Sequence, residues 1–189
     1  MKKRYVLLDR DGTINFDAHY LSSPDQLKLL PGAGAGLRRM SALGLGLVVV
    51  TNQSGIARGY FTLDQLDAIH ERLHRMLAAE GVRLDGLYVC PHGPREDCSC
   101  RKPRPGLVER AVAELGFDPA QGFMIGDKVA DVKLGQAVGA ETVLVRTGYG
   151  AEVERKGESN PDHVVDTLAE AAEIIAARLA VVVSSPRGT

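Results

Sequence analysis

The stretch YVLLDRDGT, residues 5–13, joins a nearly continuous apolar run to two carboxylates and a glycine. Runs of the same kind, typical of parallel strands covered on both faces, recur at residues 46–52, 84–90, 122–127 and 141–148. Segments with the helical spacing of apolar residues lie between or after them, at 37–44, 62–81, 105–116, 131–140 and 167–180. This alternation predicts an α/β fold with a doubly wound, mainly parallel sheet and right-handed crossovers.

The length and composition of the chain predict a single domain. With 189 residues, of which 44% are hydrophobic, the chain can bury one core of ordinary size. We assign residues 1–180 to this domain, expect a flexible tail at 181–189, and expect a loop over the polar segment 150–163. Neither segment between Asp11, Thr51 and Lys102 is long enough for a separate cap domain, so we expect an open, capless site.

The charge of the chain excludes two classes of partner. A formal net charge of -1 gives no broad positive field for nucleic acid or for an anionic membrane surface. The apolar run in the first ten residues is too short for a signal peptide or a membrane span. We therefore expect a soluble, cytoplasmic, monomeric protein that acts on a small molecule.

Polar residues stand where four of the predicted strands end, and such ends gather at one edge of a parallel sheet. Asp9 and Asp11 follow the first strand, and Thr51 lies at the end of the second. Lys102 comes after the third strand, and Asp127 ends the fourth. Three carboxylates, a hydroxyl and an ammonium group are therefore expected to converge on one rim.

The two carboxylates of the first strand indicate a cation. Asp9 and Asp11 are two residues apart, so they should point to one side while Arg10 points elsewhere. Like charges held this close repel, and an oxygen-only donor set that includes Asp127 suits Mg²⁺, which in turn suits a phosphorylated substrate. The sequence leaves two roles open for Asp131: a second layer of carboxylate around the site, or an ordinary helix residue.

The motifs DRDGT (9–13), Thr51, Lys102 and GDKVAD (126–131) resemble, in this order, the four motifs of the haloacid dehalogenase superfamily. The resemblance implies that Asp9 is the nucleophile that forms an aspartyl-phosphate and that Asp11 is the general acid and base. It also implies that Asp9, the Asp11 carbonyl and Asp127 hold a catalytic Mg²⁺. Thr51 and Lys102 would stabilise the transferred phosphoryl group.

All three cysteines of the chain lie in CPHGPREDCSC, residues 90–100, together with a histidine. Three cysteines cannot all pair with one another, and the pattern C-x-H-x5-C-x-C supplies the four donors of a tetrahedral Zn²⁺ site. The predicted ligands are Cys90, His92, Cys98 and Cys100. A closed, structural zinc site would fix a loop that is otherwise Gly, Pro and charged residues, and would thereby place Arg101 and Lys102.

The zinc loop together with TNQSGIARGYF (51–61) resembles the D-glycero-D-manno-heptose-1,7-bisphosphate 7-phosphatase subfamily. The resemblance covers nearly the whole chain. It implies removal of the 7-phosphate in ADP- or GDP-heptose biosynthesis, for a lipopolysaccharide core or an S-layer. It also implies a set of substrate-binding residues: Asp17, Ala18, His19, Tyr20, Asn52, Gln53, Ser54, Arg101 and Lys128. Because the spacer between His92 and Cys98 is shorter than in some relatives, the preferred anomer stays open.

Two alternatives to this function remain open from the sequence. Histidinol-phosphate phosphatases share DRDGT and the zinc loop, so histidinol phosphate is the second candidate substrate. A zinc-stabilised binding or scaffold protein that keeps the fold is the alternative outside enzymes, although the presence of Asp9 argues against it.

One further motif is predicted to carry no function. HERLH (70–74) fits the H-E-x-x-H pattern of zinc proteases. On an ideal helix, however, His70 and His74 lie beside the apolar stripe and partly toward solvent, so we expect them to flank a core-facing helix.

Overall fold

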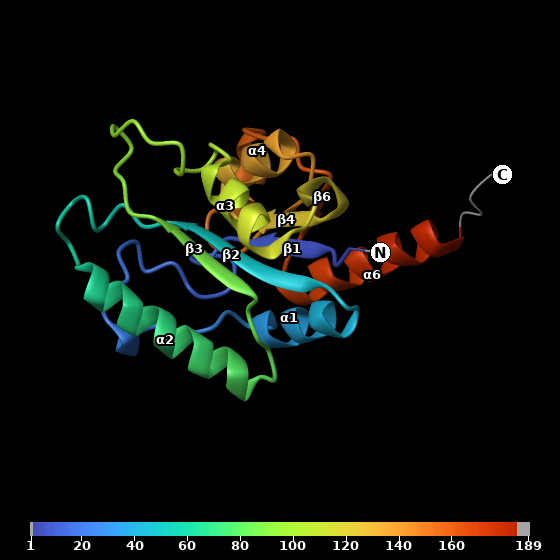
Figure 1. The fold of residues 1–189 in the computed structure, drawn as a ribbon, viewed down its shortest axis with the longest axis horizontal. Coiled ribbons are helices and arrows are strands. Elements are labelled where there is room, and N and C mark those ends of the chain that lie inside the picture. Colours follow the sequence, from blue (N-terminus) through green and yellow to red (C-terminus); the bar gives the residue numbers. More distant parts are fainter. Residues whose placement is uncertain (1, 185–189) are drawn as a thin grey trace.

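The computed structural model describes residues 2–184 of the chain. Its centre is a six-stranded sheet in the order β3-β2-β1-β4-β5-β6, and each pair of neighbouring strands is parallel (Figure 1). The strands are β1 (Tyr5–Leu8), β2 (Gly46–Asn52), β3 (Gly86–Cys90), β4 (Phe123–Gly126), β5 (Glu141–Val145) and β6 (His163–Val165). The predicted doubly wound parallel sheet is confirmed.

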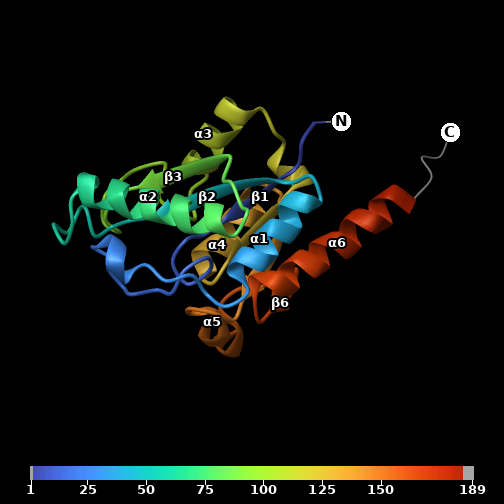
Figure 2. The same cartoon turned by 90° about the horizontal axis from the view of Figure 1, so that it is seen from below.

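Helices cover both faces of the sheet (Figure 1, Figure 2). One face packs on α1 (Ala33–Ala42), α2 (Leu63–Ala79) and α6 (Leu168–Ser184), and the other on α3 (Gly106–Leu115), α4 (Val129–Ala137) and α5 (Gly150–Lys156). Within β1, Val6 and Leu8 contact the first group, while Tyr5 and Leu7 contact the second. The strands are continuously apolar because both of their faces are buried.

The segment 150–163, which was predicted to be a loop, is only partly one. It begins with α5 and ends at the first residue of β6. Gly157 ends α5 in the left-handed conformation at φ 63°, which is a common glycine C-cap. With seven and three residues, α5 and β6 are too short to show a period in the sequence, so the prediction missed both.

The last helix is longer than predicted. α6 continues to Ser184 and does not end at residue 180, because its apolar, helix-forming sequence runs on without a glycine or proline. The rest of the predicted flexible tail, 185–189, lies outside the described residues.

Helix α2 follows its sequence pattern closely. The Thr62 hydroxyl accepts a hydrogen bond from the Gln65 N–H at 3.2 Å, and the Gln65 side chain accepts one from the Thr62 N–H at 2.8 Å. This reciprocal capping box fixes where α2 begins. The predicted apolar stripe is buried throughout: Leu66, Ile69, Leu73 and Leu77. Its burial orients the helix against the sheet, and that orientation places His70 near the end of β1.

The sheet order places β1 and β4 side by side, although the chain leaves β1 toward β2 and leaves β4 toward β5. Ligands of doubly wound sheets bind beyond the carboxyl ends of the strands at such a reversal. Across residues 2–184, neither the connection from β1 to β2 nor the one from β2 to α3 contains a separate cap domain, as predicted. Within the same residues, no helix is long and apolar enough to cross a membrane.

Candidate active site

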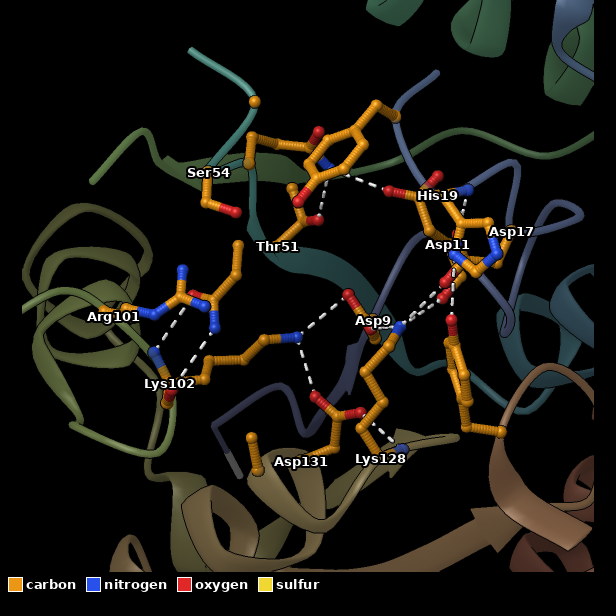
Figure 3. Close-up of a pocket in the computed structure, with 16 residues that line it drawn as sticks. Asp9, Asp11, Asp17, His19, Thr51, Ser54, Arg101, Lys102, Lys128 and Asp131 are labelled. Carbon is orange, nitrogen blue, oxygen red and sulfur yellow. Dashed lines mark hydrogen bonds and ion pairs between the residues drawn. The ribbon is translucent and has the colours of Figure 1, made fainter. Parts of the chain in front are cut away.

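The polar strand ends meet at one cavity of about 360 Å³ beyond the carboxyl edge of the sheet (Figure 3). Most of the residues that the sequence predicted for catalysis and substrate binding line it: Asp9, Asp11, Asp17, His19, Tyr20, Thr51, Asn52, Gln53, Ser54, Arg101, Lys102 and Lys128. Two predicted residues do not. Ala18 is absent from the lining, and Asp127 is fully buried behind it.

Asp9 is held from two sides at the end of β1. Its Oδ1 accepts a hydrogen bond from the Arg10 N–H at 2.7 Å and lies 2.9 Å from Nζ of Lys102. Burial opposes ionisation of Asp9, but the charges of Lys102 and Lys128 outweigh it and lower the pKa of Asp9 to about 2. An anionic carboxylate therefore lines the cavity.

Lys102 is fixed by both its ammonium group and its backbone. Nζ donates to the Val50 carbonyl at 2.8 Å and lies 2.7 Å from Oδ1 of Asp131. The Lys102 N–H donates to Asn52 Oδ1 at 3.0 Å, and the Asn52 amide donates back to the Lys102 carbonyl at 3.2 Å. Asp131 also accepts a hydrogen bond from the Lys128 N–H at 3.0 Å in the first turn of α4, so it fills both of the roles that the sequence left open.

Three oxygen atoms converge where Mg²⁺ was predicted. Asp9 Oδ2, the Asp11 carbonyl oxygen and Asp127 Oδ1 lie 3.4, 3.0 and 3.4 Å from Nζ of Lys128. Burial raises the pKa of Asp127 to about 7, so ionisation of this carboxyl group depends on a nearby positive charge. Hard oxygen donors grouped around one cation are the set that Mg²⁺ takes, so these residues fit a magnesium ion.

Gly12 makes room for this arrangement. Its φ is 84°, in the left-handed region that favours glycine, and a Cβ at this position would overlap the Asp127 carboxylate. Asp127 is held in place by the Thr13 hydroxyl at 3.2 Å and by the Tyr149 N–H at 3.0 Å. Tyr149 follows β5, and the sequence offered no motif that would have identified it.

Arg10 only partly follows the sequence prediction. As strand alternation predicted, its side chain stays out of the cavity that Asp9 and Asp11 line. Its guanidinium nevertheless turns back to Asp11, where Nε lies 3.2 Å from Oδ1 and Nη2 lies 2.7 Å from Oδ2. The reason is that β1 ends at Leu8, so alternation no longer governs the residues that follow. The Asp11 carboxylate is therefore paired with its own neighbour in the chain.

His70 was predicted to face partly toward solvent, and this prediction was wrong. The side chain is 8% exposed, and its Nε2 lies 3.0 Å from Nη1 of Arg10. Burial, followed by the charge of Arg10, lowers the pKa of His70 to about 3. His74, one turn later, is exposed. The two histidines of HERLH therefore do not face one site, as expected for a motif without a zinc function.

The inner wall on the β2 side is built by Thr51 and Gln53. The Gln53 amide donates to the Thr51 hydroxyl at 2.9 Å and to Asp11 Oδ2 at 2.8 Å. The two strand ends are thus joined across the cavity by one side chain. Thr51 keeps its hydroxyl within the lining, beside Asn52 and Ser54.

The outer rim comes from the loop at residues 17–20 and is aromatic and polar. His19 has φ 62° and its Nδ1 lies 2.9 Å from the Tyr149 hydroxyl. The Tyr20 ring meets Tyr60 edge-on, with 4.5 Å between ring centroids. Asp17 Oδ2 lies 3.3 Å from Nζ of Lys128. Such a rim suits a polar ligand that carries hydroxyl groups and charge.

The predicted zinc ligands form one cluster, and their donor atoms all lie within 4.8 Å of one another: Cys90, His92, Cys98 and Cys100. His92 Nδ1 lies 3.2 Å from Cys100 Sγ, and the Sγ atoms of Cys90 and Cys98 lie 3.8 Å apart. A tetrahedral site with Zn–S near 2.3 Å and Zn–N near 2.0–2.1 Å has ligand separations of roughly 3.4–3.8 Å. The four residues therefore fit a zinc ion.

The cluster is tied to the active-site cavity through the backbone. Cys90 ends β3 opposite Asn52, and the Cys90 carbonyl accepts the Gln53 N–H at 2.7 Å. At the other end, Nη1 of Arg101 donates to the His92 carbonyl at 3.1 Å. Arg101 follows Cys100 directly, so the geometry of the cluster sets the position of the cavity wall.

Comparisons with known proteins agree with this geometry. Residues 99–171 match the model of the HAD-hydrolase-like family. A D-glycero-beta-D-manno-heptose-1,7-bisphosphate 7-phosphatase of Pasteurella multocida is 42% identical over 180 residues, which cover 92% of this chain and 97% of that protein. The phosphatase of the same name from Escherichia coli K12 is 41% identical over 178 residues, which cover 90% and 92% of the two chains.

Solved structures point the same way. The D,D-heptose 1,7-bisphosphate phosphatase from B. bronchiseptica, complexed with magnesium and phosphate, has a TM-score of 0.87 and 36% identity, and the match covers 93% of this chain and 99% of that one. The D,D-heptose 1,7-bisphosphate phosphatase from Burkholderia thailandensis has a TM-score of 0.71 and 33% identity, covering 92% and 99%.

Proposed function

This chain belongs to the heptose-1,7-bisphosphate 7-phosphatase family of HAD-like hydrolases, and on that premise we propose that it removes the 7-phosphate of D-glycero-β-D-manno-heptose 1,7-bisphosphate with Mg²⁺. The chain is a phosphatase, an enzyme that hydrolyses a phosphate ester. The observation that carries the proposed reaction is the anionic Asp9, held between two ammonium groups at the base of an open cavity. The product would supply nucleotide-activated heptose synthesis.

Two proton transfers and two displacements make up the proposed reaction. An Asp9 oxygen bonds to phosphorus, the bond from phosphorus to the sugar oxygen breaks, and the Asp11 carboxyl gives that oxygen a proton. Water then attacks the aspartyl-phosphate, Asp11 takes a proton from the water, and inorganic phosphate leaves. Thr51 and Lys102 stabilise the phosphoryl oxygens. Mg²⁺, when held by Asp9, the Asp11 carbonyl and Asp127, supplies further neutralisation of the phosphate.

We assign the recognition of the sugar to Arg101 and to the outer rim of the cavity, the loop at residues 17–20. Arg101 presents a planar fork of donors to the cavity, which suits a second phosphate or vicinal hydroxyls of the substrate. The loop at 17–20 and the residues after Thr51 would contact the sugar from the other side. The zinc site acts in this proposal only by fixing the loop that carries Arg101.

A substrate panel tests the assignment. Phosphate release with Mg²⁺ is measured for both anomers of the heptose bisphosphate, histidinol phosphate, fructose 1,6-bisphosphate and a 3′-phosphorylated oligonucleotide. We expect kcat/KM for the β-anomer to exceed every other value by about a hundredfold, or about 3 kcal/mol of transition-state discrimination. If histidinol phosphate has the highest kcat/KM, the proposed phosphatase reaction stands but the proposed substrate is wrong. If the α-anomer of the heptose bisphosphate has the highest kcat/KM, only the proposed anomer is wrong.

Replacing Gly12 with Ala tests the space beside Asp127. The added Cβ would overlap the Asp127 carboxylate, so we expect kcat to fall about a hundredfold, the scale of a small misplacement of a reacting group. Gly44→Ala is the matched control, because Gly44 has nearly the same φ, 79°, but no atom within 4 Å of the added Cβ. Both variants should lose about 1–2 kcal/mol of stability from left-handed backbone, and Gly12→Ala should lose more than Gly44→Ala because of the overlap with Asp127. Equal kcat values in the two variants would show that Asp127 tolerates the overlap.

A further inference from the structure

Arg10 stands between Asp9 and Asp11 in the sequence, and a buried arginine is costly unless its charge is paired. Arg10 is 0% exposed, and its guanidinium meets the Asp11 carboxylate edge to edge. Nε and Nη2 lie 3.2 and 3.0 Å from Oδ1, and Nη2 also lies 2.7 Å from Oδ2. This pairing uses the planar fork of the guanidinium, which fixes orientation as well as charge.

His70 holds the other side of the same guanidinium. It lies 60 positions from Arg10 in the sequence and reaches Nη1 from the buried side of α2. Because a guanidinium only donates, Nε2 of His70 must be the acceptor, and the ring is neutral with its proton on Nδ1. A neutral acceptor anchors Arg10 by a hydrogen bond alone, so the ion pair of the guanidinium is formed with Asp11.

Two amides complete the donors around Asp11. The Asn15 side chain donates to Oδ1 at 2.9 Å, and the Gln53 side chain donates to Oδ2 at 2.8 Å. The Asp11 side chain is 17% exposed, so only an edge of it reaches the cavity. Both oxygens of the carboxyl group are therefore held in one orientation by three side chains, from Arg10, Asn15 and Gln53.

We propose that Arg10, anchored by His70, is a positioning residue that fixes the Asp11 carboxyl group for its proton transfers. The inference rests on the proposed role of Asp11 as general acid and base. Neither Arg10 nor His70 lines the cavity, so both act on the substrate only through Asp11. Their loss should therefore slow the steps that need the Asp11 proton more than any other step.

The choice of leaving group distinguishes bond cleavage that needs the Asp11 proton from bond cleavage that does not. A sugar alkoxide is strongly basic, so cleavage of its bond to phosphorus requires the proton from Asp11. A p-nitrophenolate is weakly basic and departs with the electron pair of the broken bond and no proton. Both cleavages leave the same aspartyl-phosphate on Asp9. The ratio of the two rates therefore reports on proton transfer and cancels losses of folding or of phosphate binding.

The test is the single-turnover release of the leaving group, with enzyme in excess, from the heptose bisphosphate and from p-nitrophenyl phosphate. If the panel above has favoured histidinol phosphate, that ester replaces the heptose bisphosphate. We expect His70→Leu to slow sugar release about tenfold and Arg10→Lys about a hundredfold, within the range of general acid catalysis. Release of p-nitrophenolate should change by less than about threefold in both variants.

Two further variants complete the design. His70→Gln places an amide oxygen where Nε2 stood, and it should restore the rate of sugar release to within about threefold of wild type. His74→Gln changes the exposed histidine of the same helix and should alter neither rate. If Arg10→Lys fails to fold, the three histidine variants decide the outcome alone.

The variant Asp11→Asn distinguishes a failure of the positioning role from a failure of the proposed role of Asp11. Equal slowing of both substrates by His70→Leu, or no slowing of either, would overturn the positioning role while Asp11→Asn still shows selective loss with the sugar. If Asp11→Asn itself slows both substrates equally, the proposed function of Asp11 fails, and the inference fails with it.

Discussion

Replacing Asp9 with Asn is expected to lower kcat by about 10⁴-fold or more while the protein remains folded. An amide cannot act as the nucleophile toward phosphorus, so no aspartyl-phosphate forms and the loss persists at saturating substrate. The fold should survive, because Lys102 keeps its ion pair with Asp131 at 2.7 Å after the substitution. Steady-state phosphate release at saturating heptose bisphosphate and Mg²⁺ measures the first effect, and thermal unfolding measures the second.

Asp131→Asn is the matched control for this experiment. Asp131 is as buried as Asp9, pairs with the same ammonium group and also lines the cavity, but the proposed reaction gives it no bond to phosphorus. Its kcat should therefore remain at least about a hundredfold above that of Asp9→Asn, since only one of them loses the attacking oxygen. Equal losses would assign the effect to the charge balance around Lys102 and would remove Asp9 from the role of nucleophile.

Loss of the proposed zinc site is expected to destabilise the protein and to slow catalysis together. Cys90→Ser removes a donor at the end of β3, and we expect the free energy of unfolding to fall by about 3 kcal/mol, because metal binding to the folded site contributes to stability. For a chain of this size the midpoint of thermal unfolding should drop by about 6–12 °C. We expect kcat to fall about tenfold to a hundredfold, because Lys102 follows the cluster closely and loses its fixed position.

Elemental analysis, thermal unfolding and phosphate release on the same preparations check these values. Wild-type protein should contain about one zinc per chain, the number that one four-ligand cluster binds. Ser99→Ala is the control, because Ser99 lies within the loop but offers no ligand atom. Chelated wild-type protein that keeps both its midpoint and its activity would refute a structural role for zinc.

The strands and the polar residues at their ends could be predicted because each signal is local. A buried parallel strand shows as a short apolar run, and the residue that ends it is read directly from the sequence. The parallel sheet then brings these residues together, because the ends of its strands place Asp9, Thr51 and Asp127 at one edge. Even the Cys/His cluster that fits zinc could be predicted from spacing alone, because all four of its residues fall within residues 90–100.

Arg10 and His70 could not be predicted in the same way. A helical wheel gives the direction of His70 relative to Leu66, but it does not say which segment covers that flank of α2. The alternation of side chains in β1 does not apply to Arg10, because Arg10 lies two residues beyond Leu8, the last residue of the strand. Their contact joins positions 60 residues apart, and no local pattern in the chain encodes such a pair. Tyr149 lies in a loop without a motif, so its contact with Asp127 could not be predicted from the sequence either.

The central position of β1 has a consequence for how the protein is made. Of the six described strands, β1 is synthesised first, and its partner on one side, β2, follows soon after at Gly46. Its partner on the other side is β4, where Phe123 pairs with Val6, so one edge of β1 stays unpaired until β4 has been synthesised. Contacts this distant in sequence also slow folding. A nascent chain that ends before β4 is therefore an exposed-edge intermediate, vulnerable to aggregation, in which Asp9 has not yet met Asp127.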